Sequence, residues 1–357
     1  MRRPDGIAGS WRRRAGRIAA AVALLVAGLL LLLVTDKSEP KHRGEVPQGE
    51  SCEGAAVLCA RRLDEVLFPG THNSYAASDQ PGWRFASQRY GISRQLDDGI
   101  RALLIDIHFG VSDPATGRVR TDLRAEGSDR NKVARQVPQS VLRIADRVAG
   151  RVGVGTLRGT PEPYLCHTLC ELGAEPLSRE LETIRVFLNQ HHDQVVIVIV
   201  EDYVPPATIL QAFERAGLTR YVATFDRNQP LPTLGTLIAH GHRLVVFAEE
   251  QGGSPAWYMP AFSFIQDTPL GATRPDQLSC KRYRGADRSP LLLINYWIPP
   301  FPPSVSLNAT IGRATFLRGR VQRCLGERGF RGAIVAVDFY QRTSLVAVAR
   351  ELNSRDR

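Results

Sequence analysis

The sequence has no internal repeat, and beyond its first 17 residues it carries little excess of either charge. Those 17 residues hold six arginines against one aspartate, whereas the rest of the chain holds 40 basic and 35 acidic residues. So mild an excess over a long chain gives no reason to expect a nucleic-acid partner. Hydrophobic residues make up 43% and charged residues 23% of the 357 residues, which excludes a wholly disordered, collagen-like or coiled-coil protein.

Residues 18–34 are apolar without interruption. As a helix this segment is about 25 Å long, at the short end of what crosses a bilayer. The arginines lie on its N-terminal side, so the positive-inside rule places residues 1–17 in the cytoplasm and the remainder outside. Since no A-x-A cleavage site follows, a retained signal anchor is favoured over a cleaved signal peptide. The sequence thus predicts a single-pass protein of the cell membrane with its main domain outside, with secretion as the alternative.

Six cysteines are present, an even number that fits an exported domain in an oxidising compartment. Six cysteines permit fifteen connectivities. The simplest set has two short loops and one long-range bridge, and its pairs are Cys52–Cys59, Cys166–Cys170 and Cys280–Cys324. A zinc site around Cys166, His167 and Cys170 is the functional alternative, although no second ligand pair at a usual spacing accompanies it.

The domain organisation follows from changes in composition. Residues 35–51 are polar and hold two prolines, which indicates a linker in front of one domain over 52–357. Residues 110–161 are rich in Arg and Asp, and we interpret them as an insertion between two strands that overhangs a site. A solvated surface excursion without a role is the alternative for that insertion.

Short apolar runs recur along the domain, separated by segments with helical character. The runs are 65–68, 102–109, 162–168, 194–200, 243–249, 290–297 and 332–340, and helices are expected near 128–149, 177–190, 206–216, 311–325 and 342–353. Several runs are continuous rather than alternating, as in strands buried on both faces of a parallel sheet. The pattern predicts an α/β fold with a (β/α) TIM-type barrel as the leading candidate, although it reveals seven strands and not the eighth.

Polar side chains suited to acid–base chemistry lie where these runs end. They are His72, Asn73, Asp106, His108, His167, Glu201 and Asp338. Because the carboxyl ends of barrel strands share one face, we expect a single site there. Two histidines with carboxylates suit general acid–base catalysis near neutral pH, with Asp338 fixing the tautomer of one imidazole. The oxygen donors Asn73, Asp106 and Glu201 suit a hard cation such as Ca²⁺.

Six motifs in order resemble the X domain of phosphatidylinositol-specific phospholipase C, especially the short secreted or membrane-attached forms of plants, fungi and bacteria. They are FPGTHNSY (68–75), QLDDGIRALLID (95–106), YLCHTLCELG (164–173), VVIVIVEDYV (195–204), INYWIPPFPPSVSLN (294–308) and AIVAVDFY (333–340). The likeness covers about 52–343 apart from the 110–161 insertion.

The resemblance implies a distorted (β/α) barrel that cleaves the glycerol–phosphate bond of a membrane inositol lipid. By position, His72 takes the proton of the inositol 2-hydroxyl as that oxygen attacks phosphorus. His167 then protonates the departing diacylglycerol oxygen, which leaves a cyclic inositol phosphate. Intramolecular attack is favourable because the nucleophile has a very high effective molarity. His108, Tyr203 and Trp297 are expected to contact the substrate, while the oligomeric state is not indicated by the sequence.

The resemblance leaves metal dependence open, because the family neutralises the phosphate either with Ca²⁺ or with an arginine. Asn73 and Glu201 match the calcium pattern, and Asp106 does so when Arg101 is aligned with the family's arginine in the second motif. Aligning Arg101 with the family's arginine, however, puts Leu104 at the first acidic position. A shift of two residues instead puts His108 in the place of the second acid or of the arginine. Arg101 is expected either to contact the phosphate as a catalytic group or to be a structural arginine at a strand start.

Two other functions stay open at this point. One is a related barrel phosphodiesterase acting on glycerophosphodiesters or sphingomyelin, which usually needs an acidic pair on the second strand where this chain has Leu104. The other is a catalytically silent barrel that binds lipid or a partner at the cell surface. Such a barrel has no physical need to keep both His72 and His167, so their presence favours an enzyme.

Overall fold

The computed structural model describes residues 51–122, 159–298 and 303–355. The predicted anchor at 18–34, nearly all of the predicted linker and the predicted helix at 128–149 lie outside these ranges, so they stay predictions. Within the described ranges, no helix combines the length and the apolar character that a membrane crossing requires.

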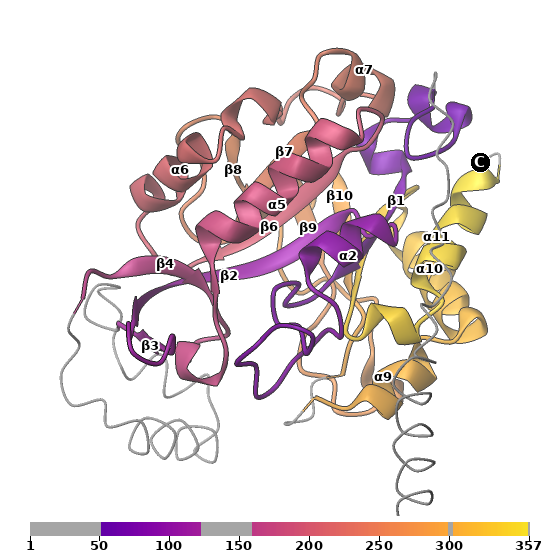
Figure 1. The fold of residues 1–357 in the computed structure, drawn as a ribbon. Coiled ribbons are helices and arrows are strands. Elements are labelled where there is room, and N and C mark those ends of the chain that lie inside the picture. Colours follow the sequence, from indigo (N-terminus) through magenta and orange to yellow (C-terminus); the bar gives the residue numbers. More distant parts are fainter. Residues whose placement is uncertain (1–50, 123–158, 299–302, 356–357) are drawn as a thin grey trace, which may run out of the picture. The chain divides into compact units, whose positions relative to one another are not determined.

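Eight parallel strands form the framework, and they lie side by side in the order in which the chain forms them (Figure 1). They are β1 (Leu67–Thr71), β2 (Ala102–Ser112), β6 (Val196–Asp202), β7 (Leu244–Ala248), β8 (Tyr258–Pro260), β9 (Ile265–Asp267), β10 (Leu291–Asn295) and β11 (Ala333–Val337). β1 pairs with both β2 and β11, so the first and last strands of the series are neighbours. Along this part of the chain, no ladder joins β8 to β9, and α8 (Ala261–Phe264) connects them instead. The predicted barrel is therefore confirmed, in a form that is open between β8 and β9.

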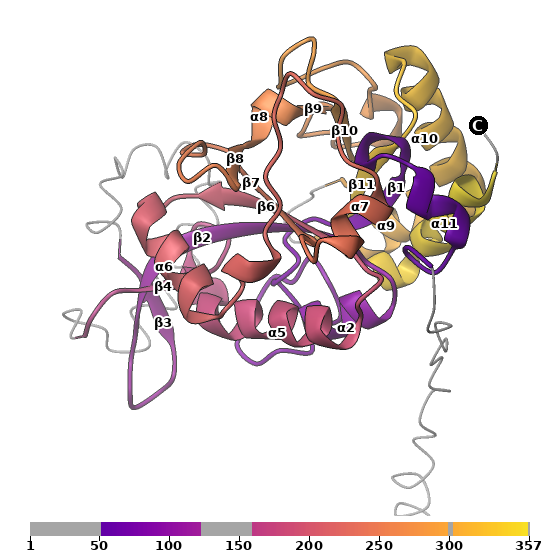
Figure 2. The same ribbon diagram turned by 90° about the horizontal axis from the view of Figure 1, so that it is seen from above.

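The helices lie outside the ring of strands, as the view in Figure 2 shows. They include α2 (Ile92–Asp97), α5 (Leu177–Gln190), α6 (Pro206–Arg215), α9 (Val305–Ile311), α10 (Ala314–Arg328) and α11 (Leu345–Ser354). Side chains of each strand alternate between this helical layer and the barrel interior. In β2, Leu103 and Ile105 pack into the outer cluster, whereas Ala102 and Leu104 belong to the inner one. Both faces of the strands are thus buried, which explains their continuous apolar runs.

Two of the barrel strands were missed and one helix was misplaced by the sequence pattern. β8 and β9 have three residues each, too few to show a periodicity. The helix predicted over 311–325 is in fact α9 followed by α10, with Gly312 between them. A Cβ at Gly312 would come within 2.4 Å of the Thr343 side chain, so this turn needs a glycine. The helices predicted at 177–190, 206–216 and 342–353 correspond to α5, α6 and α11.

The run at 162–168 is not a barrel strand, and this corrects the prediction. Its strand, β4 (Glu162–Leu165), pairs antiparallel with the outer part of β2, and β5 (Glu175–Pro176) continues that pairing. β2 is long enough for this because it has eleven residues, of which only the first part pairs with β6. The predicted insertion at 110–161 begins inside β2 and contains β3 (Val119–Thr121), which also pairs with β2. Residues 123–158 of that insertion lie outside the described ranges.

All three predicted disulfides are confirmed. Their pairs are Cys52–Cys59, Cys166–Cys170 and Cys280–Cys324. The first closes a loop in front of β1, the second closes the loop after β4, and the third ties the segment between β9 and β10 to α10. Because Cys166 and Cys170 are bonded to each other, the alternative of a zinc site at these thiolates is wrong.

Truncating a side chain in the barrel interior is expected to destabilise the whole fold. Phe247 in β7 is 0% exposed within the inner cluster. Phe247→Ala should lower the free energy of unfolding by about 3–5 kcal/mol, because it removes buried surface and leaves a cavity. Denaturant unfolding measures this difference. The matched control is Phe316→Ala at a 58% exposed position on α10, expected to change stability by no more than about 0.5 kcal/mol; equal losses would contradict the assigned interior.

Candidate active site

Polar side chains line the barrel interior at the carboxyl ends of the strands. Inward-facing positions there carry His72, Asp106, His108, Glu201, Glu249, Asp267, Asn295 and Asp338. Glu249 and Asn295 were missed although each lies in the last part of an apolar run, and Asp267 was missed because β9 (Ile265–Asp267) is too short to show a pattern. The strand ends thus form one polar site, into which residues from β1, β2, β6, β7, β9, β10 and β11 converge.

His72 and Asp338 are brought together by the register of two neighbouring strands. β1 and β11 pair up to Thr71 and Val337, so the next residue of each strand stands beside the other. His72 Nδ1 lies 2.9 Å from Asp338 Oδ1, and Asp338 is only 2% exposed. Burial raises the pKa of Asp338, although the His72 charge and hydrogen bond act in the opposite direction. A carboxylate at Nδ1 leaves Nε2 of His72 as the nitrogen available to a substrate.

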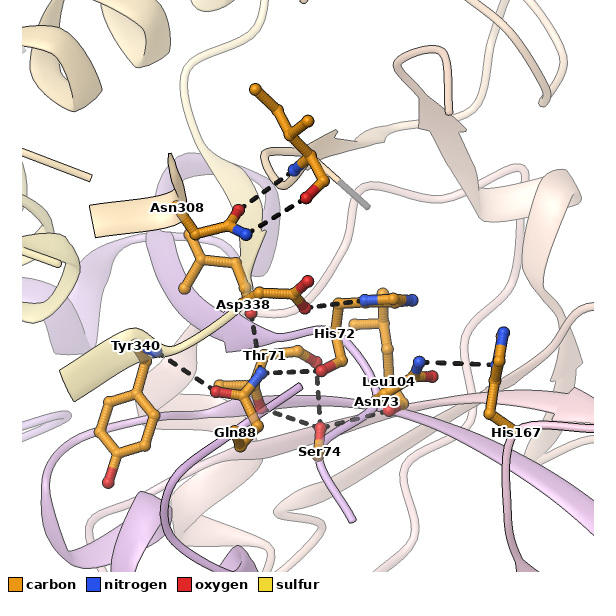
Figure 3. Close-up of polar contacts among 12 residues, drawn as sticks. Thr71, His72, Asn73, Ser74, Gln88, Leu104, His167, Asn308, Asp338 and Tyr340 are labelled. Atoms are coloured by element: carbon orange, nitrogen blue, oxygen red, sulfur yellow. Dashed lines mark hydrogen bonds and ion pairs between the residues drawn. The ribbon is translucent and has the colours of Figure 1, made fainter. Parts of the chain in front are cut away.

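Two neighbours hold this pair in place. The ring of Trp297 stacks on that of His72, with centroids 4.0 Å apart and planes at 6°. Gln88, fully buried, donates from Nε2 to the carbonyls of His72 at 2.8 Å and Val337 at 3.0 Å, and its Oε1 accepts from the Tyr340 amide (Figure 3). Gln88 thereby continues the β1–β11 pairing beyond the end of the ladder. Nothing in the local sequence marks this glutamine.

His167 reaches the same site from outside the barrel. β4 runs back along β2 until the amide of Cys166 donates to the Asp106 carbonyl at 3.4 Å. His167 Nδ1 then lies 2.9 Å from Asp106 Oδ2 and 3.5 Å from Asn73 Nδ2, the second contact appearing in Figure 3. The predicted meeting of His167 with the barrel residues therefore occurs, although through an antiparallel strand and not through a parallel one.

The electrostatics of this second pair favour its ionised form. Burial opposes the charge of Asp106, but the hydrogen bond and charge of His167 outweigh it and lower the pKa of Asp106. Desolvation likewise opposes the imidazolium, yet the hydrogen bond and charge of Asp106 raise the pKa of His167 above its ordinary value. The ring itself is accessible, because the His167 side chain is 63% exposed. The Asp106 carboxylate thus favours the protonated imidazole of His167, and the exposed ring can give a proton to a bound ligand.

The two imidazoles face each other across the site. Their centroids are 6.5 Å apart and their planes are inclined at 79°. Each ring has its own carboxylate at Nδ1, so each presents Nε2 as its free nitrogen. In such an arrangement one imidazole can take a proton from an oxygen that attacks a central atom. The other can give a proton to the oxygen that leaves that atom.

The backbone is strained at the residue directly after each of His72, His167 and Asp338. Asn73, Thr168 and Phe339 have φ of 44°, 64° and 49°, and each immediately follows His72, His167 or Asp338. In the described ranges only four residues other than glycine have positive φ. This left-handed conformation is costly for residues with a Cβ and clusters at functional sites. The turns that present the two histidines and Asp338 are therefore held by their surroundings and not by local preference.

The predicted Ca²⁺ ligands do not form an open oxygen cage. Asn73 Oδ1 accepts from the Tyr75 hydroxyl at 3.2 Å, and Asp106 is engaged by His167. Glu201 accepts from the Tyr203 hydroxyl. The described residues contain no group of three or more His, Cys, Asp or Glu side chains arranged to hold a metal. Ca²⁺ takes about six to eight oxygen ligands, and each of the three predicted protein ligands here already has a side-chain partner.

The predicted substrate-binding residues lie beside the two pairs. Tyr203, which follows β6, stacks on His108 with ring centroids 4.3 Å apart. Burial and the nearby Glu201 carboxylate raise the pKa of Tyr203, so its hydroxyl stays protonated. Burial, together with the charge of Asp106, also raises the pKa of Glu201. These aromatic rings and Trp297 give the site an apolar lining around its charged groups.

Arg101 does not belong to the site, which corrects the prediction of a catalytic role. It precedes β2, at the amino end of the strand, whereas the histidines lie at carboxyl ends. Its guanidinium donates to Glu53 at 2.9 Å and to Gln194 at 2.7 Å, and it covers the ring of Phe187 on α5. The alternative reading, a structural arginine at a strand start, is the one that its contacts support.

A second ionic network forms another wall of the site. Arg284 donates from Nη1 to Glu249 at 2.6 Å and from Nε to Asp267 at 2.8 Å. Asn295 Nδ2 donates to Asp267 at 3.3 Å. Burial raises the pKa of Glu249 to about 8, although Arg284 acts to lower it. Arg284 was missed because it comes from the connection between β9 and β10 and from no strand end.

The charge of Asp106 should control the ionisation of His167. Asp106→Asn is expected to lower the pKa of His167 toward its ordinary value, because the substitution removes the negative partner at Nδ1. An NMR titration of the histidine ring protons measures this pKa. The matched control is Asp338→Asn, which should lower the His167 pKa less because that charge acts from further away. Equal effects of the two substitutions would contradict the assigned pairing.

Comparison with known proteins places these features in a family context. The family described as PI-PLC X 1 matches residues 158–353, a segment that contains His167 and Asp338 but not His72. A PI-PLC X domain-containing protein of Arabidopsis thaliana is 28% identical over 83% of this chain and 63% of its own length. PI-PLC X domain-containing protein 1 of Arthroderma benhamiae is 26% identical over 85% of this chain and 89% of its own length. This chain thus spans less than two thirds of the plant relative.

Two further similarities are weaker. A protein of Arthroderma benhamiae described as an uncharacterized secreted protein is 24% identical over 62% of this chain and 41% of its own length. A solved structure of a variant of phosphatidylinositol-specific phospholipase C from Staphylococcus aureus has a TM-score of 0.44 at 11% identity, covering 84% of this chain and 95% of that one. Because this structural similarity is low, we base the assignment of a barrel on the order and pairing of the strands in this protein.

Proposed function

Because the chain belongs to the PI-PLC X family, we propose that it is a phosphodiesterase that cleaves inositol phospholipids through two histidine–aspartate pairs. The observation that carries this proposal is the two imidazoles 6.5 Å apart, each bound to its own carboxylate. A barrel that only binds a ligand gains nothing from two such pairs facing each other. Acid–base catalysis needs both, one to accept a proton and one to donate it.

His72 is proposed as the general base. Asp338 fixes its tautomer and stabilises the imidazolium that forms when Nε2 accepts a proton. The proton comes from the 2-hydroxyl of the inositol, whose oxygen attacks the phosphorus of the same molecule. Because the attack is intramolecular, the protein needs only to orient the inositol ring of the substrate and does not have to bind a second reactant. The stacked Trp297 keeps the His72 ring in one orientation during this step.

His167 is proposed as the general acid. Desolvation opposes its charge, but the hydrogen bond and charge of Asp106 raise the pKa of His167, which favours the protonated state that a proton donor needs. As the bond from phosphorus to the glycerol oxygen breaks, His167 gives its proton to that oxygen, and diacylglycerol leaves. The product is a cyclic inositol phosphate. At the end of this step His72 has gained one proton and His167 has lost one.

Charge on the phosphate oxygens is proposed to be met by imidazole groups and not by a metal. His167, whose imidazolium is favoured by Asp106, lies at the site, and His108 is the next inward position of β2 beyond Asp106. His108 is buried and stacked on Tyr203, which fixes the plane of its ring. This assignment follows from the donor set described above, in which the candidate metal ligands are engaged with other side chains.

The setting is proposed to be outside the cytoplasm. Three disulfides in the described residues fit an oxidising compartment. Anchoring through residues 18–34 stays a prediction, with secretion as its alternative. In either case the substrate lipid lies in a membrane surface, and the carboxyl ends of the barrel strands are the side that has to approach it.

The two histidines should both be required for turnover. The full chain, with its disulfides oxidised, is incubated with phosphatidylinositol vesicles, and the products are followed by phosphorus NMR. We expect a cyclic inositol phosphate signal, and we expect His72→Ala and His167→Ala each to lower the rate by about 10²–10⁴-fold, the usual contribution of a general acid or base. The matched control is His240→Ala, at an exposed histidine after α7 (Leu234–Ala239), which should keep the full rate.

Two results would discard the proposal. If folded protein gives no product from phosphatidylinositol, the chain is a silent barrel or acts on another phosphodiester. If both alanine variants keep the rate of the His240→Ala control, the histidine pairs have no part in turnover.

Chelation should leave the reaction intact. In the same assay, an excess of chelator is expected to change the rate less than twofold, because the candidate ligands Asn73, Asp106 and Glu201 are engaged by other side chains. Parallel samples with added Ca²⁺ provide the comparison. A rate that falls with chelator and returns with Ca²⁺ would show that these side chains exchange their present partners for a metal.

A further inference from the structure

The loop that carries His167 has its own small core, separate from the two large clusters of the barrel. That cluster consists of Tyr164, Cys166 and Cys170, with Val119 and Ala174 packed against it. Cys166 and Cys170 are 0% and 2% exposed. Two of its three buried members are therefore the two halves of one disulfide. The disulfide thus makes up most of the small core of this loop.

The disulfide closes the smallest ring that encloses His167. Cys166 and Cys170 are four residues apart, and His167 is one of the three residues between them. Inside the ring the chain turns sharply, since the amide of Leu169 donates to the His167 carbonyl at 2.7 Å. Thr168 holds a φ of 64°, which a β-branched residue rarely adopts. A conformation of this kind persists only where the surroundings impose it.

The two ends of the ring are attached to different parts of the molecule. Cys166 follows β4, and its amide donates to the carbonyl of Asp106 in β2. Cys170 is attached to β3, because its amide donates to the Thr121 hydroxyl at 2.8 Å. The disulfide links these two attachments on either side of His167 along the chain. Without it, the two backbone attachments remain but lose the covalent link between them, and the imidazole of His167 keeps only its contacts with Asp106 and Asn73.

We propose that the Cys166–Cys170 disulfide positions His167, so that the catalytic pairs are complete only in the oxidised chain. This inference rests on the proposed function for its effect on turnover, but not for its effect on His167 itself. Reduction by a dithiol transfers two electrons and two protons to the disulfide, giving two cysteine thiols and an oxidised dithiol. The chain would therefore be inactive in a reducing cytoplasm and would gain activity when the disulfide forms after export.

A double-mutant cycle tests this positioning role in the full chain. Cys166→Ser with Cys170→Ser should lower the rate of phosphatidylinositol cleavage by about 10²-fold or more, as loss of a general acid does. In the His167→Ala background the same pair of substitutions should cost less than threefold, since the group they position is already absent. Removing the other short disulfide, by Cys52→Ser with Cys59→Ser, is the matched control and should keep the rate constant at saturating substrate.

A second readout does not depend on activity. In an NMR titration of the histidine rings, loss of the Cys166–Cys170 disulfide should lower the pKa of His167 toward its ordinary value, because the contact with Asp106 is lost. The Cys52–Cys59 control should leave that pKa raised. If the wild-type chain shows no turnover, the proposed function fails and this titration alone decides the inference.

Three results would overturn the inference. One is a Cys166→Ser, Cys170→Ser variant that keeps both the wild-type rate and the raised His167 pKa. Another is a loss of rate that is equally large in the His167→Ala background, which would indicate general destabilisation. The third is the same loss of rate in the Cys52–Cys59 control, which would mean that any disulfide has this effect.

Discussion

The length of β2 is the constraint on which the arrangement of the site depends. β2 has eleven residues, whereas the other barrel strands have three to seven. Its first part pairs with β1 and β6 inside the barrel, and its outer part pairs with β3 and β4. Asp106 lies near the boundary between these two parts. A shorter strand would leave β4 without its pairing to the barrel, and His167 would have no path back to the carboxyl ends of the barrel strands.

The two histidine pairs differ in how they are held, and this difference matches their proposed roles. His72 and Asp338 continue a parallel ladder and are held by the stacked Trp297, within the packed barrel. His167 comes from a loop outside the barrel and is bound through Asp106 and a disulfide. The buried pair suits a base that acts on a head group inside the barrel. His167, whose side chain is exposed while its partner Asp106 is buried, suits an acid that meets a leaving group on the lipid side, where diacylglycerol departs.

Much of this could be read from the sequence because continuous apolar runs mark strands buried on both faces, and polar residues mark their ends. His72, Asp106, His167, Glu201 and Asp338 were placed in this way, although the run that ends at His167 is not a barrel strand. The rest depended on contacts between distant segments. Gln88 and Arg284 reach the site from connections that have no periodicity, and β8 and β9 are too short to show one. Arg101 was given a catalytic role by its alignment with the family's arginine, although the sequence already placed it at a strand start.

The central claim is that His72 acts as the base and His167 as the acid, and a change of leaving group tests it most directly. An inositol phosphodiester with a nitrophenyl leaving group needs no proton to depart, because nitrophenolate is stable at neutral pH. The measurement is the rate of nitrophenolate release by His72→Ala and His167→Ala, relative to the unsubstituted chain. The account predicts that His167→Ala recovers most of its lost rate on this substrate while His72→Ala stays inactive. Equal impairment of both variants on both substrates would contradict it.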